Sequence, residues 1–300
     1  MKSSHCFLDA ITSVVGEYQD PRPMLLGVWE ADFVIKEQKI TYFSDAINHD
    51  EYLERLNRLY GECAEHWYDY EQSKPNNLEI LQELLHSKQD EEYLVQVDLF
   101  YLPYEIRSYQ KKHMPHFIRL VKEEERFLVT DPFLDFCGEV DEKDLEDAFL
   151  LNELGGGIKL KTSNLKAPSE DEISKIFNSV FRTDNRLVTE SLRVVKEGAK
   201  DRTILREGFL EIGILGKRKL SYLAAFSLFN RRTPEIENAI IMLSKGWTHL
   251  GFLAIKASMA KMKLDIDPLL QKLHQLEQSE HEIKMNLKQS YEEWMNHVSV

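Results

Sequence analysis

The sequence predicts an α+β fold in which strands and helices are mixed in the first half and helices alone follow. Residues 93–131 contain several stretches rich in β-branched and aromatic residues, a composition typical of strands. Beyond Pro168, apolar residues instead recur every three or four positions, which is the period of an amphipathic helix. A run of three glycines at 155–157 separates the two patterns. We therefore expect one domain at residues 1–160 and a second, all-helical domain at residues 168–300.

The first helix is predicted at the start of the chain, in SSHCFLDAITSVVG. Ser4 is of a residue type that caps helices, so we expect the first turn to hold His5 and Cys6, and Gly16 to end the helix. A thiol in a first helical turn lies where free amide groups and the helix dipole stabilise a thiolate. Cys6 is therefore either an apolar core residue or a nucleophile.

Further helices are expected between Asp50 and Gly61, and from Asn77 onward. The segments YLVQVDLFYLPY, HFIRLV and RFLVTDP follow and are expected to be strands.

The second half contains three helix starts with recognisable caps. Ser169 and Glu172 form a capping box, and Thr233 and Asp267 are each followed by proline. The leucine spacing after Asp267 predicts a long helix that packs on a neighbour.

Composition limits the function classes. A net charge of -13 over 300 residues argues against nucleic acid as a partner and is compatible with a cationic substrate. The uncharged stretches, GWTHLGFLAI among them, are too short for a membrane helix, and Asp9 interrupts the first apolar run, so we expect neither a membrane anchor nor a signal peptide. Three scattered cysteines favour a reducing, cytoplasmic compartment, and scattered histidines make a metal site unexpected.

A base and an orienting group for Cys6 are expected in one hairpin. If HFIRLV and RFLVTDP pair around a loop at 122–125, Val121 faces Arg126, and His116 then faces Asp131. An imidazole in that position can bind the carboxylate through one nitrogen and a thiol through the other. The register is an assumption, because a slip of one residue would separate the two side chains.

These segments resemble a known family. HCFLDAITSVVGEY is similar to the nucleophile helix of the butirosin biosynthesis protein H family of papain-like acyltransferases, and VQVDLFYLPY, HMPHFIRLV and LVTDPF resemble its second signature. The likeness covers residues 3–135, and double-glycine exporter peptidases share the layout. The resemblance implies a papain-like (double-glycine-peptidase-like) cysteine acyltransferase domain with Cys6 as nucleophile, His116 as base and Asp131 as orienting group.

The resemblance also implies substrates and partners. Members of the family move an acyl group from a carrier-protein thioester onto an amine. We therefore expect a phosphopantetheine arm as donor, no tightly bound cofactor, an acidic acyl or aryl carrier protein as partner, and a small amine or polyamine as acceptor. The length and the helical second half look like petrobactin-biosynthesis acyltransferases, which join a dihydroxybenzoyl group to spermidine in siderophore biosynthesis.

Substrate-binding residues are expected at five positions. Glu30 and Asp32, in LLGVWEADF where the family often has glycines, are either solvated acids or carboxylates that bind a cationic amine. Asp98, Tyr104 and His113 are either ordinary polar groups of strands and turns or, as the resemblance implies, groups that line a pocket.

A docking patch for an acidic carrier is expected where basic residues cluster. Lys217, Arg218 and Lys219 form the densest cluster, and Arg231 and Arg232 follow one helix-length later. The alternative is that these are solvated cations at helix ends.

Several points stay open at the sequence level. Papain's oxyanion-hole glutamine has no counterpart here, and Gln19 and Asn48 are both candidates. A cysteine peptidase or amidase on the same scaffold is an alternative function, and a non-catalytic helical interaction protein with a core Cys6 is another. A homodimer is compatible with the sequence.

Overall fold

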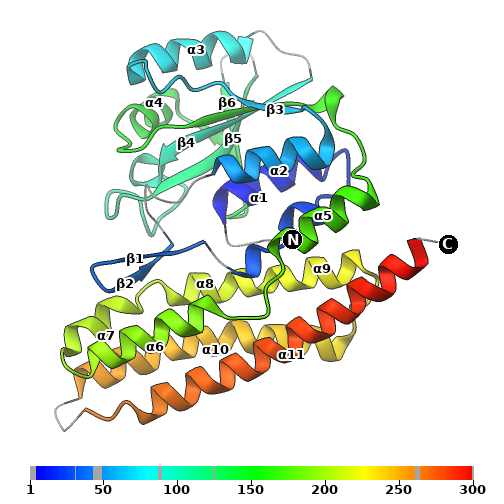
Figure 1. Ribbon diagram of the computed structural model, residues 1–300. Coiled ribbons are helices and arrows are strands. Elements are labelled where there is room, and N and C mark those ends of the chain that lie inside the picture. Colours follow the sequence, from blue (N-terminus) through cyan, green and yellow to red (C-terminus); the bar gives the residue numbers. More distant parts are fainter. Residues whose placement is uncertain are drawn as a thin grey trace.

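The α+β fold predicted from the sequence is confirmed, and the molecule is built in two layers. The computed structural model describes residues 5–30, 32–42, 49–86, 90–123, 126–260 and 264–298. Figure 1 shows an upper layer that contains the large sheet with helices on both of its faces, and a lower layer of helices that run lengthwise.

The upper layer is formed by the first half of the chain. Its helices are α1 (Cys6–Val15), α2 (Asp50–Tyr60), α3 (Lys74–His86) and α4 (Glu142–Leu150), with 3-10 turns η1 (Arg22–Leu25), η2 (Val28–Glu30), η3 (Leu99–Tyr101) and η4 (Thr162–Asn164). Its strands are β1 (Val34–Lys36), β2 (Lys39–Thr41), β3 (Ala64–His66), β4 (Glu91–Asp98), β5 (Pro115–Glu123), β6 (Arg126–Asp131), β7 (Phe136–Val140) and β8 (Gly157–Lys161).

Six of these strands form one sheet in the order β3-β8-β4-β5-β6-β7, and all neighbours in it are antiparallel. The three expected strand segments are β4, β5 and β6. The pair β1–β2 is a separate two-stranded hairpin.

The expected register of the β5–β6 hairpin is wrong by two residues. Glu123 pairs with Arg126, and Arg119 pairs with Thr130. The strands extend further toward the turn than expected, because residues 122 and 123 continue β5. Since side chains alternate between the faces of a sheet, a shift of two residues keeps every side chain on its face. His116 and Asp131 are therefore diagonal neighbours on one face, where direct opposition was expected.

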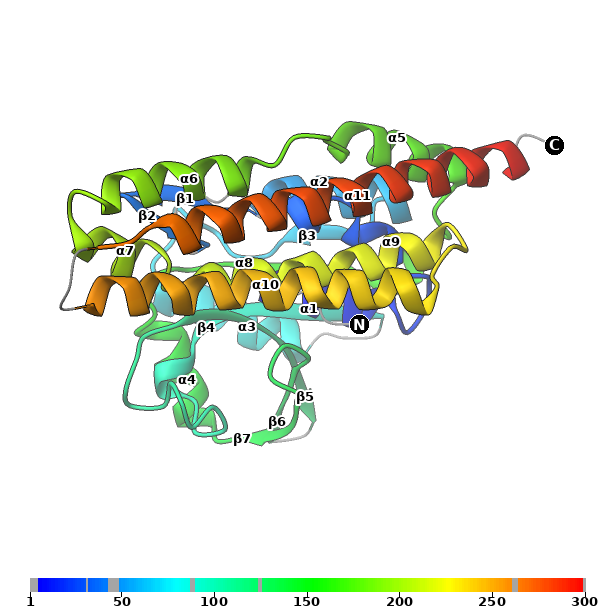
Figure 2. The ribbon, with the colours of Figure 1, turned by 90° about the horizontal axis from the view of Figure 1, so that it is seen from below.

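The lower layer is formed by the second half of the chain. It comprises α5 (Glu170–Val180), α6 (Arg186–Gly198), α7 (Arg202–Gly208), α8 (Ile212–Arg218), η5 (Lys219–Ser221), α9 (Tyr222–Leu228), α10 (Pro234–Met259) and α11 (Asp267–Val298). Figure 2, seen from below, shows α6, α10 and α11 running side by side along this layer.

The expected caps in the lower layer are present at two helices. Ser169 accepts a hydrogen bond from the Glu172 amide at the start of α5, and Thr233 accepts one from Ile236 at the start of α10. None of the helices within the described ranges has the length and apolar character that a membrane span requires.

The two layers share one apolar core. Residues of α1, α2 and the 3-10 turns pack in the same cluster as residues of α5 through α11. Trp29 of η2 stacks on Tyr222 of α9, with ring centroids 4.7 Å apart and an interplanar angle of 16°. A second core fills the space between the other face of the sheet and helices α3 and α4. Because burial of apolar surface is the main stabilising contribution, the helical half stabilises the half that carries Cys6.

Candidate active site

Cys6 occupies the first position of α1. His5 is the N-cap residue, in extended conformation, and Gly16 is the C-cap. The helix thus begins one residue later than expected, and Ser4, the expected cap, lies outside the described residues. The Cys6 thiol lies beside the first amide groups of the helix, where the helix dipole favours a negative charge.

His116 and Asp131 meet at the ends of their strands. His116 is the second residue of β5 and Asp131 the last of β6, and both side chains are buried. The Nε2 atom of His116 lies 2.9 Å from Oδ2 of Asp131. The contact is short but lacks the alignment of a good hydrogen bond, as is common at catalytic sites without substrate.

His116 also interacts with Cys6. The thiol is influenced both by the imidazole and by the backbone of Phe117. Burial opposes ionisation of the thiol, but the charge and the hydrogen bond of His116 outweigh it and lower the pKa of Cys6. Burial also opposes ionisation of the imidazole and therefore lowers the pKa of His116. The Cys6 charge and Asp131 outweigh burial and raise the pKa of His116 to about 10. The pair therefore favours thiolate and imidazolium.

Two groups hold Asp131 in place. The Tyr104 hydroxyl donates to Oδ2 at 3.1 Å, and the Leu134 amide donates to Oδ1 at 3.1 Å. The Tyr104 ring stacks on Phe136, with centroids 4.0 Å apart. Tyr104 was expected to line a pocket by resemblance, and its hydroxyl contacts the Asp131 carboxylate.

Asp98 is the last residue of β4, and His113 lies just before β5. The buried Asp98 carboxylate accepts hydrogen bonds from the amides of Phe100 and Met114, and its other oxygen lies 2.7 Å from Nδ1 of His113. The half-exposed His113 ring stacks on Phe100. These contacts tie the end of β4 to the start of β5, so they position His116 indirectly.

A second histidine, His5, precedes Cys6 in the chain. His5 is buried, and its Nε2 is 3.7 Å from Oδ2 of Asp32. The same carboxylate oxygen accepts a hydrogen bond from the Tyr52 hydroxyl. Burial and the Arg218 guanidinium lower the pKa of His5 to about 4, so this imidazole is neutral at pH 7.

Asp32 combines ionisation with access to solvent. Burial opposes its ionisation, but the interaction with His5, the hydrogen bond from Tyr52 and the charge of Arg218 hold the pKa of its carboxyl well below the usual range. Its side chain is 41% exposed. A fixed, charged and accessible carboxylate is suited to binding an ammonium group.

Glu30 does not share this environment. Its carboxylate lies 2.7 Å from the buried Nζ of Lys284 and accepts a hydrogen bond from the Trp29 indole. Burial, which outweighs the neighbouring lysines, raises the pKa of Glu30. The two acids expected to act together are thus separated, and Glu30 takes part in a buried ion pair.

The expected docking patch is wrong for Arg218 and Lys219, because both are buried. Arg218 is the last residue of the seven-residue helix α8, and Lys219 is the first residue of η5. Both are turned inward, while Lys217 is exposed. Arg231 and Arg232 lie near the surface, where they pair with Glu293 and Glu237.

The remaining candidates are readily placed. All three cysteines are free, but Cys63 is buried, and burial raises the pKa of its thiol to about 11. Gln19 donates to the Leu165 carbonyl, and Asn48 lies outside the described residues. Among the described residues, no group of three or more His, Cys, Asp and Glu side chains is placed to hold a metal ion.

No role in the site was predicted for His5 or Tyr52, and Arg218 was expected in a docking patch. The position of His5 beside Cys6 was a usable signal. Tyr52 and Arg218 join the site only through tertiary packing, which their local sequence does not show.

Comparisons with known proteins agree with this organisation. Residues 1–165 match the DUF6005 N-terminal domain, and residues 171–300 match the DUF6005 C-terminal domain. The chain is 27% identical over 309 aligned residues to petrobactin synthase of Bacillus anthracis, an alignment that covers 97% of this chain and 94% of the relative. Since the two matches together span nearly the whole chain, it belongs to the DUF6005 family.

Proposed function

We propose that this chain is a cysteine-dependent N-acyltransferase of siderophore or natural-product biosynthesis. It moves an acyl group from the phosphopantetheine thioester of a carrier protein, through a thioester on Cys6, onto a primary amine. The observation that carries the proposal is the contact of Cys6 with His116 and of His116 with Asp131 at 2.9 Å. The likeness to petrobactin synthase supports a siderophore pathway, with a dihydroxybenzoyl donor and spermidine as the acceptor to test first.

The first half-reaction uses the ion pair. The Cys6 thiolate attacks the carbonyl carbon of the donor thioester, and the carbon–sulfur bond to pantetheine then breaks. His116 gives its proton to the departing pantetheine thiolate. The products are a free pantetheine thiol, an S-acyl Cys6 and a neutral His116. The donor arm belongs to the carrier, so no cofactor needs to be tightly bound.

The second half-reaction follows from the loss of the thiolate. Once Cys6 is acylated, the negative charge that raised the pKa of His116 is gone. The neutral imidazole then accepts a proton from the attacking amine as the new carbon–nitrogen bond forms. The bond from carbon to the Cys6 sulfur breaks, and the thiolate–imidazolium pair is restored.

Asp32 is proposed to bind the amine acceptor. A polyamine has more than one ammonium group, so one can be held by Asp32 while another, deprotonated, attacks the thioester. The exposed side chain of Asp32, its charge and its contact with His5, the neighbour of Cys6, support this role.

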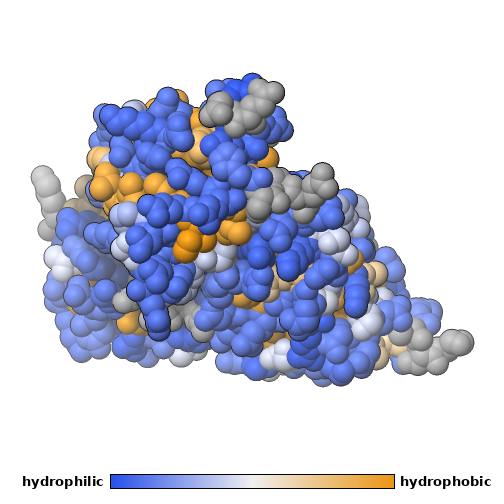
Figure 3. Space-filling view, turned by 90° about the horizontal axis from the view of Figure 1, so that it is seen from above, coloured by the Kyte–Doolittle hydropathy of each residue, from blue (hydrophilic) through white to orange (hydrophobic). Residues whose placement is uncertain are grey.

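The carrier protein is proposed to dock on the exposed cations Lys217, Arg231 and Arg232. Complementary charge would steer an acidic carrier toward a chain that is acidic overall. Figure 3 shows that the face seen from above is hydrophilic over most of its area, with apolar side chains gathered near the lobe that projects at the top.

We further propose a papain-like domain and a cytoplasmic location. A nucleophile at the start of a helix and a histidine on a strand form the arrangement that papain-like enzymes use. A reducing compartment would keep the three free cysteines reduced.

Intact-protein mass spectrometry tests the proposal. The protein is mixed with an acylated carrier protein, and a mass increase equal to the acyl group, mapped to Cys6, is expected. Addition of spermidine should remove the adduct and release an amide. Release of the free acid at the same rate with and without amine would indicate a hydrolase, such as a cysteine peptidase or amidase. A protein that acquires no adduct would contradict the proposed mechanism.

A further inference from the structure

Three cations of the helical half contact one short stretch of the first half. Lys219 donates to the Trp29 carbonyl at 2.7 Å, and Lys284 lies 2.7 Å from the Glu30 carboxylate. Arg218 donates to the backbone carbonyl of Asp32 at 2.8 Å. Arg218 and Lys219 are consecutive residues at the junction of α8 and η5, and Lys284 comes from α11, more distant in the sequence.

All three cations are buried. Lys219 is 0% exposed, Lys284 1% and Arg218 3%. A buried ammonium or guanidinium group is costly unless it is paired and hydrogen-bonded, so such groups are usually kept for a specific arrangement of their partners. Here each of the three cations has its own partner in the stretch that carries Trp29, Glu30 and Asp32.

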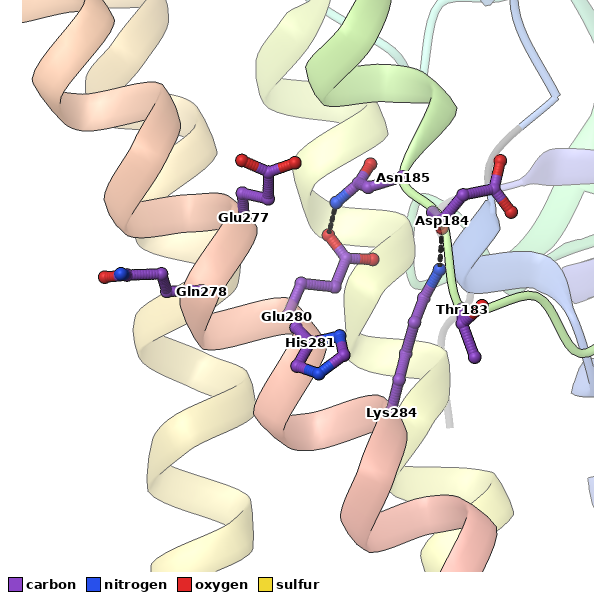
Figure 4. Close-up of a pocket in the computed structure, with 8 residues that line it drawn as sticks. All are labelled: Thr183, Asp184, Asn185, Glu277, Gln278, Glu280, His281 and Lys284. Carbon is purple, nitrogen blue, oxygen red and sulfur yellow. Dashed lines mark hydrogen bonds between the residues drawn. The ribbon is translucent and has the colours of Figure 1, made fainter.

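A second set of contacts fixes the lysines themselves. Glu280 of α11 binds Lys219 at 2.5 Å and accepts hydrogen bonds from Tyr222 and Asn185. Lys284 also donates to the Asp184 carbonyl at 2.6 Å. Figure 4 shows the Lys284 side chain extended toward Asp184, and the Glu280 side chain directed toward Asn185, beside a pocket of about 290 Å³. The lysine heads therefore have little freedom to leave their positions.

The stretch that the three cations contact ends at Asp32, the residue proposed to bind the amine acceptor. Asp32 contacts His5 and Tyr52 through its carboxylate while Arg218 holds its carbonyl. The carboxylate of Asp32 is thus positioned by the first half at its side chain and by the helical half at its backbone.

We propose that Arg218, Lys219 and Lys284 are positioning residues for the acceptor amine, and that the helical half sets the affinity for the amine by holding Asp32 against His5, the residue before Cys6. This inference rests on the proposed function of Asp32. It gives the helical domain a part in one half-reaction, because the donor half-reaction depends on His116 and Asp131, which these cations do not contact.

The test removes one ion pair without leaving a buried charge unpaired. In the double variant Glu30→Gln/Lys284→Met, an amide and an apolar chain of similar size replace the pair. Lys288→Met is the matched control, because Lys288 lies one turn further along α11 and is half exposed. Folding of each variant is checked by circular dichroism and a cooperative melt.

Two rates are then measured. Acylation of Cys6 by a small thioester donor should stay within about twofold of the wild-type rate, since the triad is unchanged. The KM for spermidine in the second step should rise about tenfold or more, as expected when a charge-assisted hydrogen bond is misplaced. The control should show neither change. Lys284→Arg keeps the positive charge, and the pocket beside Lys284 offers space for the larger guanidinium group. This variant should keep the KM for spermidine within about threefold of wild type.

The outcomes separate the two proposals. If the wild-type protein forms no acyl-Cys6, the proposed function fails and the variants are not needed to show it. If the wild type is acylated and the folded double variant keeps a wild-type KM, the inference is wrong. A parallel fall in acylation and amine transfer would also overturn it, because that result means a general structural role.

Discussion

Two sets of side chains in the first half of the chain have the same composition. One contains His116, Asp131 and Tyr104, and the other contains His5, Asp32 and Tyr52. In each set a histidine contacts an aspartate, and a tyrosine hydroxyl donates to that aspartate. The two histidines nevertheless have opposite properties, because the pKa of His116 is raised and that of His5 is lowered.

The difference comes from the charges that each imidazole faces. Both rings are buried, which lowers both pKa values. His116 faces the Cys6 thiolate and Asp131, and these outweigh burial. His5 faces the Arg218 guanidinium, which adds to the effect of burial, and the effects that lower the pKa together outweigh the opposing effect of Asp32. The lesson is that a His–Asp–Tyr motif does not define an acid or a base by itself, and its neighbours decide.

The largest expected effect is at Cys6, the proposed nucleophile. Cys6→Ala should fold normally and lose all transfer. At pH 6, iodoacetamide should label Cys6 in the wild type, since its pKa is lowered, and leave Cys63 unlabelled. Peptide mapping of the label checks this. Labelling of Cys63 or Cys137 in preference to Cys6 would remove the basis for the assignment.

Removal of His116 should have the next largest effect. His116→Ala should slow acylation of Cys6 at least about 10²-fold, the usual size of a general acid–base contribution. Burial still raises the pKa of the thiol while the cation that lowered it is absent, so the alkylation rate should rise only at higher pH. A rate–pH profile measures the shift. An unchanged profile would mean that His116 does not ionise Cys6.

Groups that only orient His116 should matter less. Tyr104→Phe removes one hydrogen bond to Asp131 and keeps the stacking on Phe136, so we expect a loss of about threefold to tenfold in acylation, in line with one hydrogen bond. Asp131→Asn should cost more than this and less than His116→Ala. Stopped-flow acylation with a small thioester orders the three variants, and the reverse order would contradict the orienting role.

Asp32→Asn tests the other set. It should raise the KM for the amine about tenfold while acylation stays within about twofold, because the ammonium loses a charged partner. Steady-state kinetics at several amine concentrations separate these quantities. If acylation falls as well and the amine KM does not change, the two sets are not divided between the two half-reactions.

The smallest effect is expected at the docking patch. Lys217→Glu/Arg231→Glu/Arg232→Glu should slow acylation by a carrier-bound donor about threefold to tenfold at low salt, with little effect above about 0.3 M salt because the charges are screened. A small thioester donor needs no docking and is the control. Equal slowing with both donors would indicate a damaged fold.

Much of the site near the sheet could be predicted from the sequence. Cys6 at a helix start and the pair His116 and Asp131 in one hairpin are local features of the sequence. Cap signals were enough to predict the helix start, and the hairpin was enough to bring His116 and Asp131 near each other. The two-residue error in register did no harm, because it preserved the faces of the strands. A prediction that depended on direct opposition would have failed.

The second set could not be predicted in this way. His5, Asp32 and Arg218 come from three distant parts of the chain, and their meeting depends on how the helical half packs on the first half. Basic residues in GKRKLSY look like a surface patch, because the sequence shows charge and not burial. Lys219 is completely buried only because Glu280, 61 residues further along, supplies its partner.

The three buried cations also bear on how such proteins can be recombined. The two family matches meet between residues 165 and 171, which makes that boundary an obvious crossover point for chimeras between relatives. A chimera made there would take Trp29 and Glu30 from one parent and Lys219 and Lys284 from the other. Exchange of the halves therefore preserves the acceptor site only when both parents carry matching partners on the two sides of the crossover, and these four positions are the ones to compare before any such exchange.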